Sequence, residues 1–145
     1  MLLLKNRRAT YDYQISQTFK AGVVLTGAEV KSLRQKSGSL TGSYVQIVDG
    51  QAVLLGAQIS PYQYANNDNY DPKRTRRLLL HRREIARLDE ICHQKHYTLV
   101  PLAFLLEGRH IKLEVGVGRG KQTFEKREQI KKRQWQREQK NLEKW

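Results

Sequence analysis

The residues best suited to chemistry in this 145-residue chain are basic, and the densest group lies between positions 73 and 87. Seven of these fifteen residues are basic, with Glu84 as the sole acid: Lys73, Arg74, Arg76, Arg77, Arg82, Arg83 and Arg87. Such a group repels itself unless a polyanion neutralises it. Two or three of these bases alone would suit a solvated strand face, but this density favours contact with RNA or DNA phosphates.

A second basic group lies at the end of the chain. Residues 119–145 hold ten basic and four acidic residues, and their large apolar residues are Phe124, Ile130, Trp135, Leu142 and Trp145. Glu128 lies one helical turn before Lys131 and Lys132, which favours a helix. So thin an apolar stripe predicts that this helix frays when free and orders on a partner. The alternative is a structureless solubilising tail, but such a tail has no use for the indole of Trp135.

Residue types that could bind metal or catalyse a reaction are scattered. Cys92, His93 and His96 are close in sequence, but a structural zinc site needs four ligands and the chain has one cysteine. The carboxylates fall mostly at expected turns and caps: Asp12, Glu29, Asp49, Asp68 and Asp71. The chain has no nucleophile elbow and no phosphate-binding P-loop. We therefore expect no catalytic residue, no metal and no cofactor.

Composition supports a binding protein of one domain. The length suits a single core, and 39% of the residues are hydrophobic. A net charge of +13 exceeds what solubility needs and indicates a polyanionic partner, nucleic acid above all. The single cysteine excludes an internal disulfide, and no apolar run approaches the roughly 20 residues of a membrane span. The start, MLLLKNRRA, lacks the order of a signal peptide. We expect a cytoplasmic monomer that does not enter a membrane.

The elements that must position these bases begin with an extended segment, residues 11–26, with a bend or bulge at Ala21-Gly22. A short helix follows in TGAEVKSLRQKSG. Thr26 and Glu29 have the spacing of a capping box, and Gly38 is expected in the left-handed conformation past the helix end.

Two hairpins and a second helix complete the pattern. Asp49-Gly50 predicts a tight turn between two strands, and Glu107-Gly108 predicts the turn of a later hairpin. Residues 60–72 are expected to form a loop. A strand near 75–80 precedes a helix over 82–94, with His81 at its N-cap and Glu84 three residues on.

This order predicts a mainly β fold with short helices. An oligonucleotide-binding (OB-like) β-barrel over residues 1–118, followed by a basic C-terminal tail over 119–145, is the expected organisation, although other small barrels fit the pattern equally well. Gly116, Gly118 and Gly120 alternate before Lys121. They predict either a backbone approach to phosphate or a hinge between barrel and tail.

Four segments resemble one known family in the right order and spacing. They are NRRATYDYQI (6–15), GAEVKSLRQ (27–35) with SYVQI (43–47), DPKRTRRLLLHRREI (71–85) with HYTLVP (96–101), and GRGKQTFEKREQIKKR (118–133). Together they cover nearly the whole chain, and they are similar to the SsrA-binding (small protein B) family of trans-translation factors.

The resemblance implies a fold and a function. The family's OB-type barrel binds the tRNA-like domain of transfer-messenger RNA and brings that RNA to bacterial ribosomes stalled on truncated messages. Its tail becomes helical in the empty message channel, against small-subunit ribosomal RNA at the decoding centre.

The resemblance also implies site residues. Leu79 and His81 lie in the RRLLLH segment, whose counterparts meet RNA, and Lys112 matches a lysine on the RNA surface. The tRNA-like domain is therefore expected at Arg74, Arg76, Arg77, Leu79, His81 and Lys112. The ribosome is expected at Gly120, Lys121, Phe124, Glu125, Lys126, Arg127, Ile130 and Trp135. Leu79 as ordinary barrel core remains the alternative.

Several positions depart from the family pattern. Lys20 replaces a frequent Glu, so an acidic RNA contact is not expected there. Gln122 replaces a usual Lys, and Glu125 replaces Asp. Phe124 stands where Tyr or His is common, so its expected role is stacking on a base. His96 replaces a usual Gly, without a functional explanation.

Two other functions compete with the trans-translation adaptor. A general ribosomal RNA-binding barrel would have the same composition, and the motif order is what favours the adaptor. A nuclease or RNA-modifying enzyme would need a clustered set of acids or a metal site, which the sequence lacks.

Overall fold

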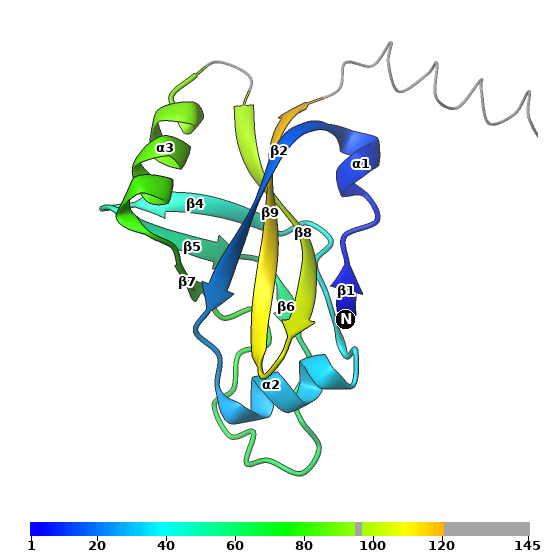
Figure 1. Ribbon diagram of the computed structural model, residues 1–145. Helices are drawn as coiled ribbons and strands as arrows, with labels where there is room; N and C mark the ends of the chain where they lie inside the picture. Colours follow the sequence, from blue (N-terminus) through cyan, green and yellow to red (C-terminus); the bar gives the residue numbers. More distant parts are fainter. Residues whose placement is uncertain (95–96, 121–145) are drawn as a thin grey trace, which may run out of the picture.

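The computed structural model describes residues 1–94 and 97–120. Its elements are β1 (Leu2–Lys5), α1 (Ala9–Asp12), β2 (Tyr13–Val23), α2 (Gly27–Arg34), β3 (Gly38–Ser39), β4 (Tyr44–Val48), β5 (Gln51–Leu55), β6 (Gln58–Ile59), β7 (Arg76–Leu79), α3 (Arg82–Cys92), β8 (Tyr97–Glu107) and β9 (His110–Gly120). Figure 1 shows α2 at one end of the strands and α3 on one side.

The strands close into a barrel. One sheet has the order β1-β8-β4-β5-β7-β2-β9, and β9 also pairs with β8, which completes the ring. The β8–β9 pairing runs from Tyr97 opposite Arg119 to Glu107 opposite His110. The prediction of a mainly β chain with short helices and an OB-like barrel is confirmed.

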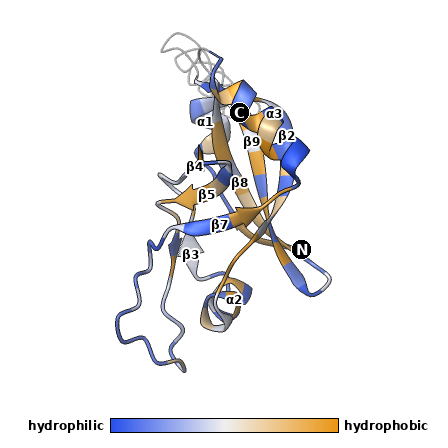
Figure 2. Cartoon of the chain, turned by 90° about the vertical axis from the view of Figure 1, so that its left-hand side faces the viewer, coloured by the Kyte–Doolittle hydropathy of each residue, from blue (hydrophilic) through white to orange (hydrophobic). Residues whose placement is uncertain are grey.

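The core lies inside this ring. Side chains of successive strand residues point to opposite faces, so β9 buries Leu113, Val115 and Val117 on one face. Leu33 from α2 and Leu88 from α3 are fully buried and belong to the same core cluster. Apolar residues are concentrated on the barrel strands in Figure 2, where the view is turned by 90°.

Two local predictions from turn and cap residues are confirmed. The β4–β5 hairpin turns at Asp49 and Gly50, whose φ angles are 49° and 75°. At the start of α2, the Glu29 amide donates to Thr26 Oγ1 at 3.2 Å and the Thr26 amide donates to Glu29 Oε1 at 3.0 Å. These two bonds are the predicted capping box.

Other local predictions are wrong by small shifts. The β8–β9 turn lies at Gly108 and Arg109, because Glu107 already pairs with His110. The register of β2 shifts between Ile15 and Gln17, rather than at residues 21–22. Tyr11 and Asp12 belong to α1, so the extended segment starts at residue 13. Helix α3 ends at Cys92, two residues earlier than expected.

Gly38 has a different role from the predicted one. The left-handed residue after α2 is Lys36, with φ 58°. Gly38 lies in β3 instead, where a Cβ atom would come 2.5 Å from the carbonyl oxygen of Gln58. Close strand approach therefore explains the glycine.

The alternating glycines near the end of β9 are also explained by packing. Gly116 and Gly118 are buried, and a Cβ at Gly116 would come 2.9 Å from Leu102 Cδ1 and 3.0 Å from Ile15 Cγ2. Neither residue is a hinge or a phosphate contact, so both alternatives are wrong for these two positions. Strand β9 continues to Gly120 opposite Tyr13, two residues beyond the expected end of the barrel.

Candidate nucleic-acid interface

Three strands bring Leu79 and Lys112 to one place on the barrel. Gly22 in β2 lies opposite Leu79 of β7 on one side and opposite Lys112 of β9 on the other. Neighbouring strands are about 4.8 Å apart, so the two side chains start about 10 Å apart across Gly22. Because Gly22 has no side chain, the middle of this row is lower than its ends.

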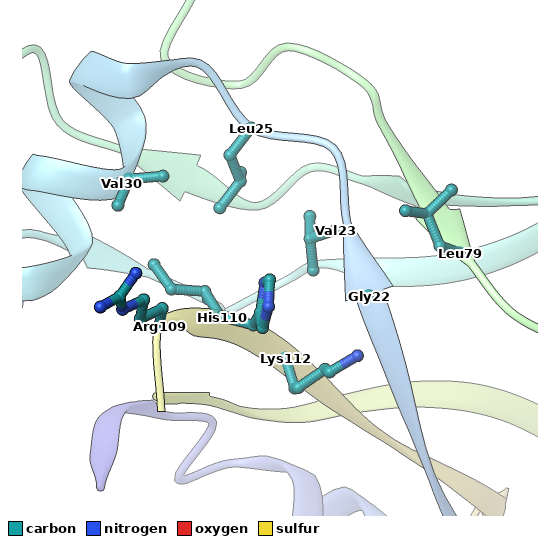
Figure 3. A pocket seen from close by; sticks show the side chains of 9 residues that line it. Gly22, Val23, Leu25, Val30, Leu79, Arg109, His110 and Lys112 are labelled. Carbon is teal, nitrogen blue, oxygen red and sulfur yellow. The ribbon is translucent and has the colours of Figure 1, made fainter. Parts of the chain in front are cut away.

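A pocket of about 230 Å³ opens at this row. Its apolar wall includes Val23, Leu25, Val30 and Ile111, and its polar lining includes Arg109, His110 and Lys112. Figure 3 shows Leu79 and Lys112 on the two sides of Gly22, with His110 and Arg109 further along. The pocket thus combines apolar side chains with an arginine, a histidine and a lysine.

Leu79 faces outward from the barrel. Along β7, Leu78 is 2% exposed in the core, whereas Leu79 is 54% exposed. The alternative that Leu79 is ordinary barrel core is therefore wrong. An exposed leucine between basic residues offers an apolar contact, against which the face of an unstacked base can pack.

Arg76 corrects the sequence prediction. We expected it on the RNA surface, but its side chain is fully buried. Its guanidinium donates to the carbonyl oxygens of Ala57 at 2.7 Å, Arg74 at 2.9 Å and Pro72 at 3.0 Å. A group enclosed in this way cannot meet a phosphate, so Arg76 is structural.

The buried partner of Arg76 is Glu29, the capping-box residue. Arg76 Nε donates to Glu29 Oε2 at 2.8 Å, and Arg74 donates to Glu29 Oε1. Tyr70 joins the cluster, since its hydroxyl donates to the carbonyl oxygen of Ile59 at 2.8 Å and lies 3.3 Å from Glu29 Oε2. One carboxylate thereby ties α2, β7 and the loop before β7 together.

The charges in this cluster shift two pKa values in opposite directions. Burial by itself raises the pKa of Glu29, but hydrogen bonds from Arg74, the Thr26 amide and Arg76 outweigh it, so the pKa lies below its ordinary value. Burial, followed by the negative charge of Glu29, raises the pKa of Tyr70. The cluster therefore keeps Glu29 ionised and Tyr70 neutral at physiological pH.

The other two predicted arginines of this segment differ from Arg76. Arg74 is half-buried: it contacts Glu29, and its Nη2 donates to the carbonyl oxygen of Val24 at 3.3 Å. Arg77 is exposed on the outer face of β7. Arg77 is thus the arginine of this strand that a phosphate can reach.

His81 is exposed at the start of α3, two residues beyond Leu79. Its amide donates to Glu84 Oε1 at 3.1 Å, so the predicted N-cap position is confirmed. Its side chain is not part of the pocket lining. Arg82, Arg83 and Arg87 are exposed on the helix that His81 begins.

Three residues that line the pocket were not predicted from the sequence: Gly22, Arg109 and His110. Arg109 and His110 are in the β8–β9 turn region, and a basic residue in a hairpin turn gives no signal of a site by itself. Lys20 of β2 forms an exposed ion pair with Glu107, which ends β8 in this hairpin, and this contact raises the pKa of Lys20. Of the predicted tail residues, Gly120 is the exposed end of β9, and Lys121 to Trp135 lie outside the described residues.

The described residues contain neither a cluster of metal-ligand side chains nor a membrane-spanning helix. Within residues 1–94 and 97–120, no group of three or more His, Cys, Asp or Glu side chains is placed to hold a metal ion. Among the same residues, no helix is long and apolar enough to cross a membrane.

The fold and the pocket together define a class of protein: a small OB-like barrel with a basic outer face, an architecture typical of nucleic-acid binding. The family model described as "SmpB protein" matches residues 3–144. The chain belongs to this family, whose curated members are called SsrA-binding proteins.

Individual relatives agree with this membership. The SsrA-binding protein of Roseiflexus sp. (strain RS-1) is 46% identical over 134 residues, which cover 92% of this chain and 85% of the relative. The SsrA-binding protein of Lactobacillus johnsonii is 46% identical over 137 residues, covering 94% and 91%. A solved structure described as "tmRNA-SmpB: a journey to the center of the bacterial ribosome" contains a chain that is 43% identical, with a TM-score of 0.71; the match covers 85% of this chain and 87% of that one.

Proposed function

We propose that this chain binds the tRNA-like domain of transfer-messenger RNA and delivers that RNA to stalled ribosomes for trans-translation. The observation that carries the proposal is the row Leu79–Gly22–Lys112, in a member of the SsrA-binding family. The chain acts as an adaptor, and the proposal assigns it no reaction.

The pocket suits recognition of RNA shape. A splayed base packs on Leu79 and enters the depression over Gly22, while Lys112 and Arg109 neutralise neighbouring phosphates. Arg77 and the exposed arginines of α3 extend the phosphate contacts along the strand and helix. The RNA is then recognised through the base in the pocket and through its folded shape.

The tail has the second role in this proposal. Gly120, Lys121, Phe124, Glu125, Lys126, Arg127, Ile130 and Trp135 would meet small-subunit ribosomal RNA at the decoding centre and in the empty message channel. The charge of residues 119–145 supports a polyanionic partner. The division into a barrel and a tail belongs to the same proposal, with the strand end at Gly120 as the natural limit of the barrel.

A binding titration tests the role of the barrel, and a ribosome-rescue assay on the same two proteins tests the role of the tail. Full-length protein and a 1–120 truncation are titrated with the tRNA-like domain and with an ordinary tRNA at one near-physiological salt concentration. We expect both proteins to prefer the tRNA-like domain, and only the full-length protein to support ribosome rescue. Equal affinity for the two RNAs would contradict the proposal and favour a general ribosomal RNA-binding barrel.

A further inference from the structure

Residues 60–72, the first part of the connection between β6 and β7, form an irregular loop that is held by hydrogen bonds. Asn67 Nδ2 donates to the carbonyl oxygen of Tyr62 at 2.9 Å, and the Ala65 amide donates to the same carbonyl at 3.1 Å. At its far end, the Tyr70 hydroxyl is bound to Ile59 and near Glu29. The loop therefore has internal bonds and an anchor in the buried cluster, which hold its tip in one shape.

This fixed loop presents two tyrosines. The rings of Tyr62 and Tyr64 meet edge to face, with centroids 5.5 Å apart and planes at 69°. Tyr62 is half-buried, with the Lys31 ammonium 5.5 Å from its ring centroid, whereas Tyr64 is 77% exposed. A side chain so exposed contributes little to the core, so burial does not account for the aromatic ring at this position.

The surroundings of the tyrosines are basic. Lys31, Arg34 and Lys36 are exposed on α2 or just after it, and Lys73 is exposed at the end of the loop. The acids nearby are Asp68 and Asp71, and Asp71 accepts the amide of Lys73 at 3.0 Å. An exposed aromatic ring with cations on neighbouring segments is a combination that binds unpaired bases of RNA.

The tyrosines lie one helix away from the pocket described above. Val30 lines that pocket, and its neighbour Lys31 lies over Tyr62. In Figure 2 the loop and the β8–β9 turn lie on the two sides of α2. A helix with its side chains is about 10–12 Å wide, which a few nucleotides can span. One RNA can therefore contact the pocket and the loop together.

We propose that the 60–72 loop is a second RNA-binding site, in which Tyr64 stacks on an unpaired base while Lys31 and Lys36 neutralise adjacent phosphates. The tRNA-like domain as the RNA in question rests on the proposed function. Tyr62 supports the ring of Tyr64 through the edge-to-face contact. The contacts of Tyr70 with Ile59 and Glu29 hold the loop in place against the barrel.

The test compares full-length wild type with Tyr64→Ala, Tyr64→Phe and Tyr64→Leu, using the tRNA-like domain and an ordinary tRNA as probes. We expect Tyr64→Ala to weaken binding of the tRNA-like domain roughly 5- to 150-fold, the range for loss of one base–aromatic stack. Tyr64→Phe keeps the affinity, and Tyr64→Leu falls between. Tyr44→Ala is the matched control, because Tyr44 is 52% exposed on β4, outside the loop.

Chemical probing of the bound RNA supplies an independent readout. Wild type and Tyr64→Phe should protect an unpaired base that stays reactive with Tyr64→Ala. Unchanged affinity of Tyr64→Ala, or equal affinity of Tyr64→Leu and Tyr64→Phe, overturns the stacking site. If wild type binds both RNAs equally, the proposed function fails instead, and the Tyr64 variants are then compared on either RNA.

Discussion

The two faces of β7 carry neighbouring arginines in opposite surroundings. On the inner face, Arg76 is fully buried and bonded to Glu29 and three carbonyl oxygens. On the outer face, Arg77 and Leu79 are exposed beside the pocket. The same residue type thus serves the fold on one face and is available to RNA on the other. A cluster of bases in a sequence is not one functional unit.

Removing one member of the buried cluster should give the largest difference in stability between substitutions on the two faces of β7. Glu29→Ala or Arg76→Ala leaves a charge buried without its partner, so we expect the free energy of unfolding to fall by about 3–5 kcal/mol. Urea denaturation followed by circular dichroism measures this loss. Arg77→Ala is the matched control and should change stability by less than about 0.5 kcal/mol. Equal losses for Arg76→Ala and Arg77→Ala would mean that the two faces do not differ.

Acid should reduce the stability that the buried Glu29 cluster contributes on the inner face of β7. The pKa of Glu29 is lowered in the folded protein, so its stabilising contribution is complete above the ordinary value of 4.5 and is lost as pH falls through the lower folded pKa. The measurement is the free energy of unfolding between pH 6 and pH 3, for wild type and Glu29→Gln. The variant should be less stable at pH 6 and flatter with pH. Parallel curves would remove Glu29 as a source of the acid sensitivity.

A methyl group in the row Leu79–Gly22–Lys112 should affect RNA binding more than folding. In Gly22→Ala, the new Cβ would lie 3.2 Å from Leu79 Cβ, so Leu79 must move slightly and the depression fills. We expect roughly tenfold weaker RNA binding, about 1.4 kcal/mol, with a stability change within about 1 kcal/mol. Titration with the tRNA-like domain, together with a thermal melt, checks both. Full affinity in a folded Gly22→Ala protein would show that nothing enters the depression.

The smallest expected effect belongs to the exposed arginine. Arg77→Ala should weaken binding evenly across RNA sequences and lower the slope of log affinity against log salt by about 0.7–0.9, the value of one phosphate contact. Titrations at several salt concentrations give this slope. An unchanged slope would leave Arg77 as a solvated surface residue.

The burial of Arg76 can be predicted from the sequence, but its pairing with Glu29 cannot. Side chains alternate along a strand, so Arg76 shares the inner face with Leu78, and this follows once the register of RRLLL is known. The register was ambiguous because three leucines follow one another. Glu29 was predicted as a cap from its spacing to Thr26, and that spacing says nothing about an arginine 47 residues later in the chain.

Barrel and hairpins were predictable for a local reason, and the pocket was not. Alternating apolar residues and turn residues such as Asp49-Gly50 specify strands and turns within a few positions. The row Leu79–Gly22–Lys112 depends on pairing between strands far apart in the sequence, so no local pattern indicates that Gly22 lies between the other two. Only the family resemblance placed Leu79 and Lys112 on one surface beforehand.

Strand β9 has one further consequence. It starts at the pocket with His110 and Lys112, ends at Gly120, and is paired with β2 and β8 along most of this length. The eight steps of strand from Lys112 to Gly120 span about 26 Å. Because both edges are hydrogen-bonded, this span cannot stretch without breaking two ladders. Strand β9 therefore sets a fixed distance between the pocket and Gly120, the end of the barrel.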